Sequence, residues 1–299
     1  MIKSLTLNNV TYAADRQITF VPTVNMLHNT EETDNTIVLD SIWCGLTNTW
    51  PQKINNTIST NKMPTVVNMK MPSIDLLYND ELITSMFVRR EQSWNRVGNR
   101  ITDAIIMYFM NNSAVSLYDP SKNNVLVLSK SNTYDGYNDQ KGNPRCNGMI
   151  YDLVYWQREK GERFERFLNI LYTFSKHYNK KFIVSDPTRI EIHDIRDYLT
   201  LKMNDSSIPL VFLPEPVQKL IQLAYIITWT IYEHNAISLR LRNHQPVNKI
   251  IFMMDSFENN LYANWKELFV KSIQEVLCGY QTQFIISTYD VNQVTLHQQ

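Results

Sequence analysis

Three carboxylates near the end of the chain, Asp255, Glu258 and Asp290, have the chemistry of metal ligands. An apolar run over residues 249–254 ends in Asp255, and Asp290 follows a second apolar run over residues 283–288. Such runs suit parallel strands that are covered on both faces, and the acids would then lie at the strand ends. Carboxylate oxygens are ligands that Mg²⁺ prefers. The three acids therefore predict either a metal site or polar groups that stay at the sheet edge without a ligand.

The cysteines and histidines do not form a set of metal ligands. The cysteines are far apart in the sequence, and no histidine has the spacing of a zinc ligand, which excludes a disulfide framework and a usual zinc site. We interpret Glu233 and His234 as the solvated end of a helix. Trp156 and Trp229 are interpreted as core or interface residues rather than as platforms for base stacking.

Composition narrows the classes of function. The 29 basic and 29 acidic residues cancel, so charge gives no reason to expect a nucleic-acid partner. No run approaches ~18 apolar residues and the first residues have no apolar signal segment, so neither membrane spanning nor secretion is expected. Free thiols favour a reducing compartment, and we expect the cytoplasm. A length of 299 residues allows one large domain or a core with an inserted lobe.

Both ends of the chain predict the strands and helices of an α/β core. Short strands are expected near residues 2–7, 18–20, 24–27 and 66–71, and Asp34 is expected to cap an amphipathic helix over residues 38–46. In the last third, residues 220–232 predict a helix that is buried on several sides. Strands over 249–254 and 283–288, with a helix over 265–277 between them, predict a right-handed crossover.

The middle of the chain is expected to be mainly helical. Apolar residues recur at helical spacing over residues 97–108 and 164–174, and Glu159–Arg163 and Glu162–Arg166 pairs support the second helix at i,i+4. Residues 125–128 predict a strand, and the polar residues 129–148 predict a loop. We therefore expect residues 1–75 and 206–299 to form two parts of one core, and residues 76–205 to form a mainly helical insertion.

The order of these segments resembles the SMC/RecF-like branch of ABC-type P-loop ATPases, and most of all its overcoming-lysogenization-defect-type members. The opening MIKSLTLNNV…ITFVPTVNML resembles the first strands of that family, and IVLDSIWCGL resembles the helix after its phosphate loop. LPEPVQKLIQLAYIITWTIYEH resembles the signature helix, KIIFMMDSFENNLYANWKELF the Walker B strand and the segment after it, and QFIISTYD the switch strand. The resemblance implies an ABC-type P-loop NTPase-like α/β core with a mostly parallel sheet and an inserted helical lobe.

The phosphate loop that the resemblance implies is degenerate. The motif GxxxxGK[ST] matches residues 29–36, where Asn29 and Asp34 replace the glycines and Asn35 replaces the lysine. Thr36 alone keeps its expected chemistry as a Mg²⁺ or phosphate ligand.

The residues around this loop also oppose phosphate binding. No glycine precedes Gly45, so the backbone cannot easily form an anion-binding nest, and no lysine lies between Lys3 and Lys53 to substitute. Glu31 and Glu32 add negative charge, and two like charges 4 Å apart repel by about 4 kcal/mol at an effective dielectric of 20.

The other motifs that the resemblance implies have changed in the same direction. Asp255 keeps the Walker B acid, but Ser256 stands at the position of the catalytic glutamate and cannot polarise an attacking water well. The Ser-Gly pair of the signature motif falls on Glu215 and Pro216, and Tyr289 replaces the switch histidine. Changes at four independent positions predict a fold that is kept without hydrolysis.

Two classes of function follow from these residues, and a third, a DNA-binding clamp without hydrolysis, stays open but is disfavoured by the balanced charge. The first is a catalytically inactive ATPase-like scaffold, sensor or regulator in a protein complex, for which the resemblance implies bacterial anti-phage defence. Its partner would be a second copy, an active ATPase relative or an effector protein. No cofactor is expected, and ATP and Mg²⁺ are disfavoured. The alternative is an enzyme, either a residual nucleotide-binding ATPase or a metal-dependent hydrolase that uses Asp255, Glu258 and Asp290.

Overall fold

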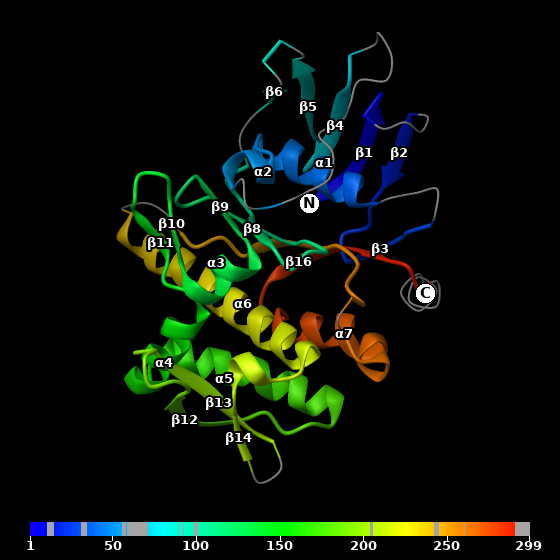
Figure 1. Ribbon diagram of the computed structural model, residues 1–299. Helices are drawn as coiled ribbons and strands as arrows, with labels where there is room; N and C mark the ends of the chain where they lie inside the picture. The colour runs from blue at the N-terminus through cyan, green and yellow to red at the C-terminus, as the bar shows by residue number, and fades with distance from the viewer. Residues whose placement is uncertain are drawn as a thin grey trace. The chain divides into compact units, whose positions relative to one another are not determined.

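The computed structural model describes residues 1–10, 15–30, 35–55, 58, 71–88, 90–91, 93–98, 101–203, 206–241, 245–259 and 261–290 (Figure 1). Its elements in chain order are β1 (Ile2–Asn8), β2 (Arg16–Thr19), β3 (Val24–His28), α1 (Thr36–Thr47), α2 (Pro51–Ile54), β4 (Ser73–Tyr78), β5 (Glu81–Val88), β6 (Ser93–Val97), β7 (Ile105–Phe109), β8 (Val115–Asp119), β9 (Asn124–Leu128), α3 (Lys130–Asp135), β10 (Tyr137–Asn138), β11 (Pro144–Cys146), α4 (Met149–Glu159), α5 (Glu162–Tyr178), β12 (Ile183–Arg189), β13 (Asp197–Met203), β14 (Ser206–Pro209), a 3₁₀ turn η1 (Leu210–Phe212), α6 (Glu215–Arg240), β15 (Lys249–Met254), α7 (Ala263–Val276) and β16 (Gln281–Thr288). Within these described ranges, no helix is both long and apolar enough to cross a membrane.

The chain divides into two compact units, and each is described by itself. The first unit consists of Met1–Ser129, Val247–Phe257 and Tyr280–Gln299. The second consists of Lys130–Pro246 and Glu258–Gly279. Each unit is therefore built from segments that are far apart in the sequence.

A six-stranded sheet in the order β3-β16-β15-β7-β8-β9 runs through the first unit (Figure 1). Its first four strands are parallel to one another. Strand β8 pairs antiparallel with β7, and β9 pairs antiparallel with β8. Every residue of β7 is buried, as are five of the six in β15, which explains their continuous apolar sequences. The registers Thr288↔His28 and Met254↔Phe109 bring the carboxyl ends of the parallel strands to one edge.

A second sheet of the first unit is antiparallel, in the order β2-β1-β4-β5-β6. Burial alternates along β4, as expected for a strand with one face on a core. Helix α1 packs against β4 and β5. All nine residues from 38 to 46 are buried, so this helix is covered on every side and not on the single apolar face that the sequence predicts.

Gln283 of β16 connects the two sheets of the first unit. Its side chain is fully buried and accepts the N–H of Ile2 at 2.8 Å. Its amide nitrogen donates to the carbonyls of Ile2 and Val21, each also at 2.8 Å. A buried amide is stable only when its polar atoms are bonded, and here three hydrogen bonds satisfy it.

The second unit is mainly helical. Helix α5 packs against both α6 and α7, and Tyr178 of α5 stacks on Trp265 of α7 with ring centroids 4.6 Å apart. A three-stranded antiparallel sheet in the order β12-β13-β14 belongs to the same unit. Helix α6 has 26 residues, and residues on several of its sides, such as Leu220, Tyr225 and Ile227, are buried.

Most elements that were predicted at the two ends of the chain are confirmed. Strands β1, β2, β3, β15 and β16 and helices α1, α6 and α7 lie where the patterns indicate, and β15 and β16 pair in parallel. In the middle, β9 and α5 are confirmed. Arg163 pairs with Glu159 at 2.7 Å, but Glu159 is the last residue of α4, so this pair lies between two helices and does not support α5 as predicted. The predicted cap, Asp34, and residues 66–70 of the expected strand lie outside the described residues. Asn35 precedes α1 without a side-chain capping bond.

The helix expected over residues 97–108 is wrong. Strand β6 ends at Val97, and β7 occupies Ile105–Phe109. Because both faces of β7 are buried, its apolar residues do not alternate with polar ones as in a half-buried strand. Apolar residues three or four positions apart then do not distinguish a helix from a strand. The loop expected over residues 129–148 is wrong in part, because it contains α3, β10 and β11.

The expected segment boundaries also differ from the observed units. Residues 76–128, assigned to the helical insertion over 76–205, contain all of β5–β9, and these strands join the sheets of the first unit through β4 and β15. Helix α6, assigned to the core segment 206–299, belongs to the second unit together with α7. Pairing between distant strands, such as β7 with β15, cannot be detected from local patterns, and the expected core segment 1–75 therefore omits β5–β9.

Candidate functional site

A cluster of buried polar residues lies at the carboxyl-terminal edge of the parallel strands in the first unit. Strand β3 ends at His28, β15 at Met254 and β16 at Thr288, and helix α1 begins at Thr36. The parallel pairing aligns these ends. In open α/β sheets, ligands bind at this edge.

Asp255, directly after β15, is at the centre of the cluster and is 2% exposed. Its Oδ2 accepts a hydrogen bond from Thr36 Oγ1 at 2.7 Å. Its Oδ1 accepts from Ser287 Oγ at 2.5 Å and from Ser256 Oγ at 3.2 Å. Its backbone N–H donates to the carbonyl of Phe109 at 2.8 Å. Three hydroxyl groups thus solvate the carboxylate where water is largely absent.

Ser287 and Ser256 fix this arrangement from the strand ends. The backbone N–H of Ser256 donates to Ser287 Oγ at 2.8 Å, so the Ser287 hydroxyl accepts one bond and donates another to Asp255. Ser256 has a φ of 49°, in the left-handed region, which costs a non-glycine residue roughly 1–2 kcal/mol. The chain therefore turns sharply after Asp255, and the hydroxyl of Ser256 points back to that carboxylate.

Asn29 and Asn35, at the two ends of the predicted phosphate loop, are joined by a hydrogen bond. Both are buried, with exposed fractions of 2% and 0%. The Oδ1 of Asn29 accepts the backbone N–H of Asn35 at 3.1 Å, and the Nδ2 of Asn35 donates to the carbonyl of His28 at 2.7 Å. Asn35, which stands in the lysine position, is thus directed at the end of β3. Asn29 is tied to β16 by its N–H, which donates to the carbonyl of Thr288 at 2.7 Å.

The remaining sequence-predicted residues are placed as follows. Residues 31–34, which include Glu31, Glu32 and Asp34, lie outside the described residues. Glu215 and Pro216 form the first turn of α6 in the second unit, as expected for a segment that begins a helix. Tyr289 follows β16 and is 59% exposed.

The carboxylates that were considered as metal ligands do not make a recognisable site. Within the ranges that the structure describes, no group of three or more His, Cys, Asp or Glu side chains is arranged to hold a metal ion. Asp255 and Glu258 are both buried, and the N–H of Asp290 donates to Thr288 Oγ1 at 3.0 Å. The ligand set of Asp255, Glu258 and Asp290 is therefore not assembled.

The cluster fits one half of a magnesium–nucleotide complex and not the other. A threonine hydroxyl and a strand-end aspartate in contact are the protein ligands that Mg²⁺ takes in P-loop ATPases. The phosphates, however, require a lysine and free backbone N–H groups at the start of the helix. Here Asn35 stands where the sequence resemblance expects the lysine, and the Oδ1 of Asn29 accepts one of these N–H groups. The residues therefore do not fit a bound nucleoside triphosphate.

Sequence reasoning missed Ser287. It considered Tyr289 and Asp290 in the segment after β16, whereas the hydroxyl that contacts Asp255 lies one residue before the end of that strand. The available signal was the polar pair Ser287–Thr288, which ends an otherwise apolar run.

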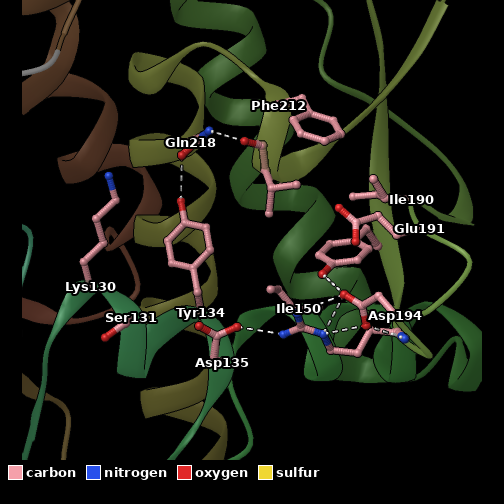
Figure 2. A pocket seen from close by; sticks show the side chains of 13 residues that line it. Lys130, Ser131, Tyr134, Asp135, Ile150, Ile190, Glu191, Asp194, Phe212 and Gln218 are labelled. Carbon is pink, nitrogen blue, oxygen red and sulfur yellow. Dashed lines mark hydrogen bonds and ion pairs between the residues drawn. The ribbon is translucent and has the colours of Figure 1, made fainter.

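A separate pocket of about 710 Å³ lies in the second unit (Figure 2). Arg196 donates to both carboxylate oxygens of Asp194 and, through Nη1, to Asp135 at 2.8 Å. Hydrogen bonds from Arg196 and Tyr198 hold the pKa of Asp194 well below its usual value. Figure 2 shows dashed lines at Asp135 and Asp194, and the hydrogen bonds of both carboxylates to Arg196 leave the charge of that guanidinium compensated.

Comparison with known proteins shows the fold. No protein-family model matches the chain, and neither does any curated protein. An SMC head solved with the C-terminal winged-helix domain of ScpA is similar with a TM-score of 0.53 and 15% identity, over 98% of this chain and 91% of that one. The SMC head domain from Thermotoga maritima has a TM-score of 0.47 and 13% identity, over 99% and 91% of the two chains. RecF with a bound ATP analogue has a TM-score of 0.47 and 10% identity, over 98% and 93%. The chain has the α/β fold of an ABC-type ATPase head.

Proposed function

We propose that this chain is an ABC-type ATPase-like subunit that does not hydrolyse nucleotide and acts as a scaffold, sensor or regulator in a protein complex. The sequence resemblance implies bacterial anti-phage defence as its setting. The proposal depends on the degenerate site of the first unit, because an ATPase fold alone is compatible with many functions.

Burial of Asn35 is the observation that carries the proposal. In a working P-loop, the lysine at this position extends to the β- and γ-phosphates as a point charge. Asn35 is uncharged and fully buried, and its amide donates to the carbonyl of His28. No lysine elsewhere between Lys3 and Lys53 supplies the missing charge. Phosphate binding therefore lacks its main cationic contact.

Ser256 supports the same proposal at the hydrolysis step. An active ATPase needs a group that orients and polarises water next to the γ-phosphate. The Ser256 hydroxyl donates to Asp255, and its N–H donates to Ser287. A neutral hydroxyl that is engaged in this way is a poor general base.

A weak Mg²⁺–nucleotide site is the competing function, and the contact between Thr36 and Asp255 favours it. These two residues keep the types that ligate Mg²⁺, and their oxygens are 2.7 Å apart. A metal-dependent hydrolase that uses Asp255 belongs to the same class of alternative. Either enzyme would depend on the Asp255 carboxylate.

An activity assay separates the two functions. We expect purified protein with ATP and Mg²⁺ to release no more phosphate than the Asp255→Ala variant does. Turnover by the native protein that Asp255→Ala abolishes would establish the enzyme and end the proposal. The same pair of proteins, tested with Mg²⁺ or Mn²⁺ on nucleic acid and on phosphate esters, tests the hydrolase.

A protein partner is the second part of the proposal. The similar SMC head was solved with a domain of another protein, ScpA, and the family resemblance implies head-to-tail pairing of ATPase domains. The second unit exposes Ile192, Ile195 and Phe212 to 91%, 83% and 63%, and exposed apolar side chains of this size favour a protein contact. Light scattering at micromolar concentration tests self-pairing. We expect a mass above the 35.2 kDa of one chain, and a mass of one chain would exclude self-pairing.

A further inference from the structure

A lysine-rich pocket with aromatic walls lies in the second unit, apart from the cluster around Asp255. Its volume is about 550 Å³, which is within the range of small-molecule sites. Nine residues line it: Lys180, Lys181, Phe182, Ile183, Lys202, Val217, Tyr262, Asn264 and Trp265. We call this cavity the lysine–aromatic pocket. It is formed by the segment between α5 and β12, by β13, by α6 and by the start of α7.

All charged residues that line the lysine–aromatic pocket are lysines. Ile183 and Lys202 are register partners in β12 and β13, so the chain places Lys202 beside Lys180 and Lys181. Within the described part of the chain, none of the three lysines forms an ion pair. Three ammonium groups without a counter-charge make the pocket attractive to an anion. This differs from the pocket in Figure 2, where Arg196 is neutralised by Asp194 and Asp135.

The first turn of α7 adds to this positive potential. Tyr262 is its N-cap, and its first turn contains no acidic residue. The N-terminal end of a helix carries a partial positive charge, and here no carboxylate of the first turn offsets it. The helix has 14 residues and is long enough for that effect.

Aromatic rings form another wall of the pocket. Trp265 is 1% exposed, and Tyr178 stacks on it at 4.6 Å, which fixes its ring. Tyr262 meets Trp265 edge-on at 4.7 Å and is 41% exposed, and Phe182 meets it edge-on at 6.1 Å. Trp265 Nε1 is buried without a hydrogen-bond partner among the described residues. Rigid aromatic rings beside cationic groups are the features that bind a planar base and its phosphate.

We propose that the lysine–aromatic pocket binds a nucleotide through its phosphate and its base. Lys180, Lys181 and Lys202 contact the phosphate, and Tyr262 and Phe182 stack on or flank the base. This site goes beyond the proposed function, because it lies in the second unit and uses neither Thr36 nor Asp255. A free nucleotide and the 5′ end of a single-stranded oligonucleotide share this chemistry.

The test uses AMP with the full-length protein in EDTA, conditions under which a Mg²⁺-dependent triphosphate site contributes nothing. Tryptophan fluorescence and calorimetry follow the binding, because the base would stack near Trp265. We expect AMP to bind, and the double variant Lys181→Ala/Lys202→Ala to bind about tenfold more weakly or worse, since it loses two charge-assisted contacts. Lys271→Ala, which removes an exposed lysine elsewhere on α7, should bind as the native protein does.

Further measurements separate the phosphate contact from the base contact, and a free nucleotide from the end of a nucleic acid. Tyr262→Ala should weaken the binding of AMP and leave the binding of inorganic phosphate unchanged. A 5′-phosphorylated oligothymidylate that binds tighter than AMP identifies the end of a nucleic acid as the ligand, and the reverse order identifies a free nucleotide. No binding of AMP or oligothymidylate at millimolar concentration would overturn the proposal, as would full binding by the double variant. Loss of AMP binding in Thr36→Ala would place the ligand at the first unit instead, and this too would overturn it. A failure of this site leaves the activity comparison with Asp255→Ala unaffected.

Discussion

Ser287 shows at the scale of one residue how the cluster around Asp255 is held together. Its hydroxyl accepts from the N–H of Ser256 and from Asn29 Nδ2 and donates to Asp255, so one oxygen serves three buried partners. Sequence reasoning identified Asp255 and Thr36, because their types and their order along the chain resemble those of a family motif. It could not identify Ser287, because a serine at the end of a strand has no function until pairing sets it beside a carboxylate.

Replacement of Ser287 by alanine should destabilise the first unit. The change leaves the N–H of Ser256 without its acceptor and removes one donor from the buried Asp255. A buried polar group without a partner costs about 1–3 kcal/mol, and we expect a loss of that size in the free energy of unfolding by urea. Ser93→Ala, at the edge strand β6, is the control and should change stability by less than about 0.5 kcal/mol. An unchanged urea midpoint for Ser287→Ala would contradict the bonds described here.

The strands and helices show which physical signals a sequence carries. Amphipathic helices such as α5 and α7 were predicted correctly, because one buried face leaves a clear period. Strand β7 was not, because burial on both faces removes the alternation that distinguishes a strand from a helix. The partition into units was missed for another reason. It depends on pairing between β7 and β15, which are more than a hundred residues apart.

Gln283 allows a test of how the two sheets of the first unit are joined. Leucine has a similar size but forms none of the three hydrogen bonds that Gln283 makes with Ile2 and Val21. We expect Gln283→Leu to lower the free energy of unfolding by about 2 kcal/mol, since the N–H and the carbonyl of Ile2 lose their bonds to Gln283, whereas the carbonyl of Val21 keeps its bond from Asn25 Nδ2. Gln281→Leu, at the exposed start of the same strand, should have little effect. Equal stability of the two variants would show that Gln283 does not join the sheets.

The contact between α5 and α7 should depend on pH. Hydrogen bonds from Lys176 and His177 lower the pKa of Glu275 below its ordinary value of 4.5. A carboxylate with a lowered pKa in the folded state stabilises that state above its unfolded pKa, and the gain is lost as the pH falls through the folded pKa. Glu275→Gln should therefore melt below the native protein at pH 7, and the difference should shrink below about pH 4.5. The exposed Glu267→Gln serves as the matched control, and a pH-independent difference for Glu275→Gln would contradict the assignment.

At the scale of the whole molecule, the fold is that of an ABC-type ATPase head, whereas the residues at the expected nucleotide site differ from those of an active ATPase. The similarity to an SMC head covers nearly the whole chain and establishes the ABC-type architecture. The residues that would hold and cleave a triphosphate are changed at the phosphate loop, beside Asp255 and after β16. In the function that we propose, the packing of the fold is kept for stability, while the site lacks the lysine and the catalytic acid that hydrolysis needs.

Calorimetry with ATP and Mg²⁺, on the native protein and on Asp255→Ala in parallel, tests this account most directly. The carboxylate of Asp255 is the group that a Mg²⁺–nucleotide complex would need at this sheet edge. The account predicts no binding at millimolar ATP that depends on Mg²⁺ and on Asp255, so the two titrations should be the same. Micromolar binding by the native protein that Asp255→Ala abolishes would contradict it, and would mean that the segment from Asn29 to Thr36 still holds a triphosphate.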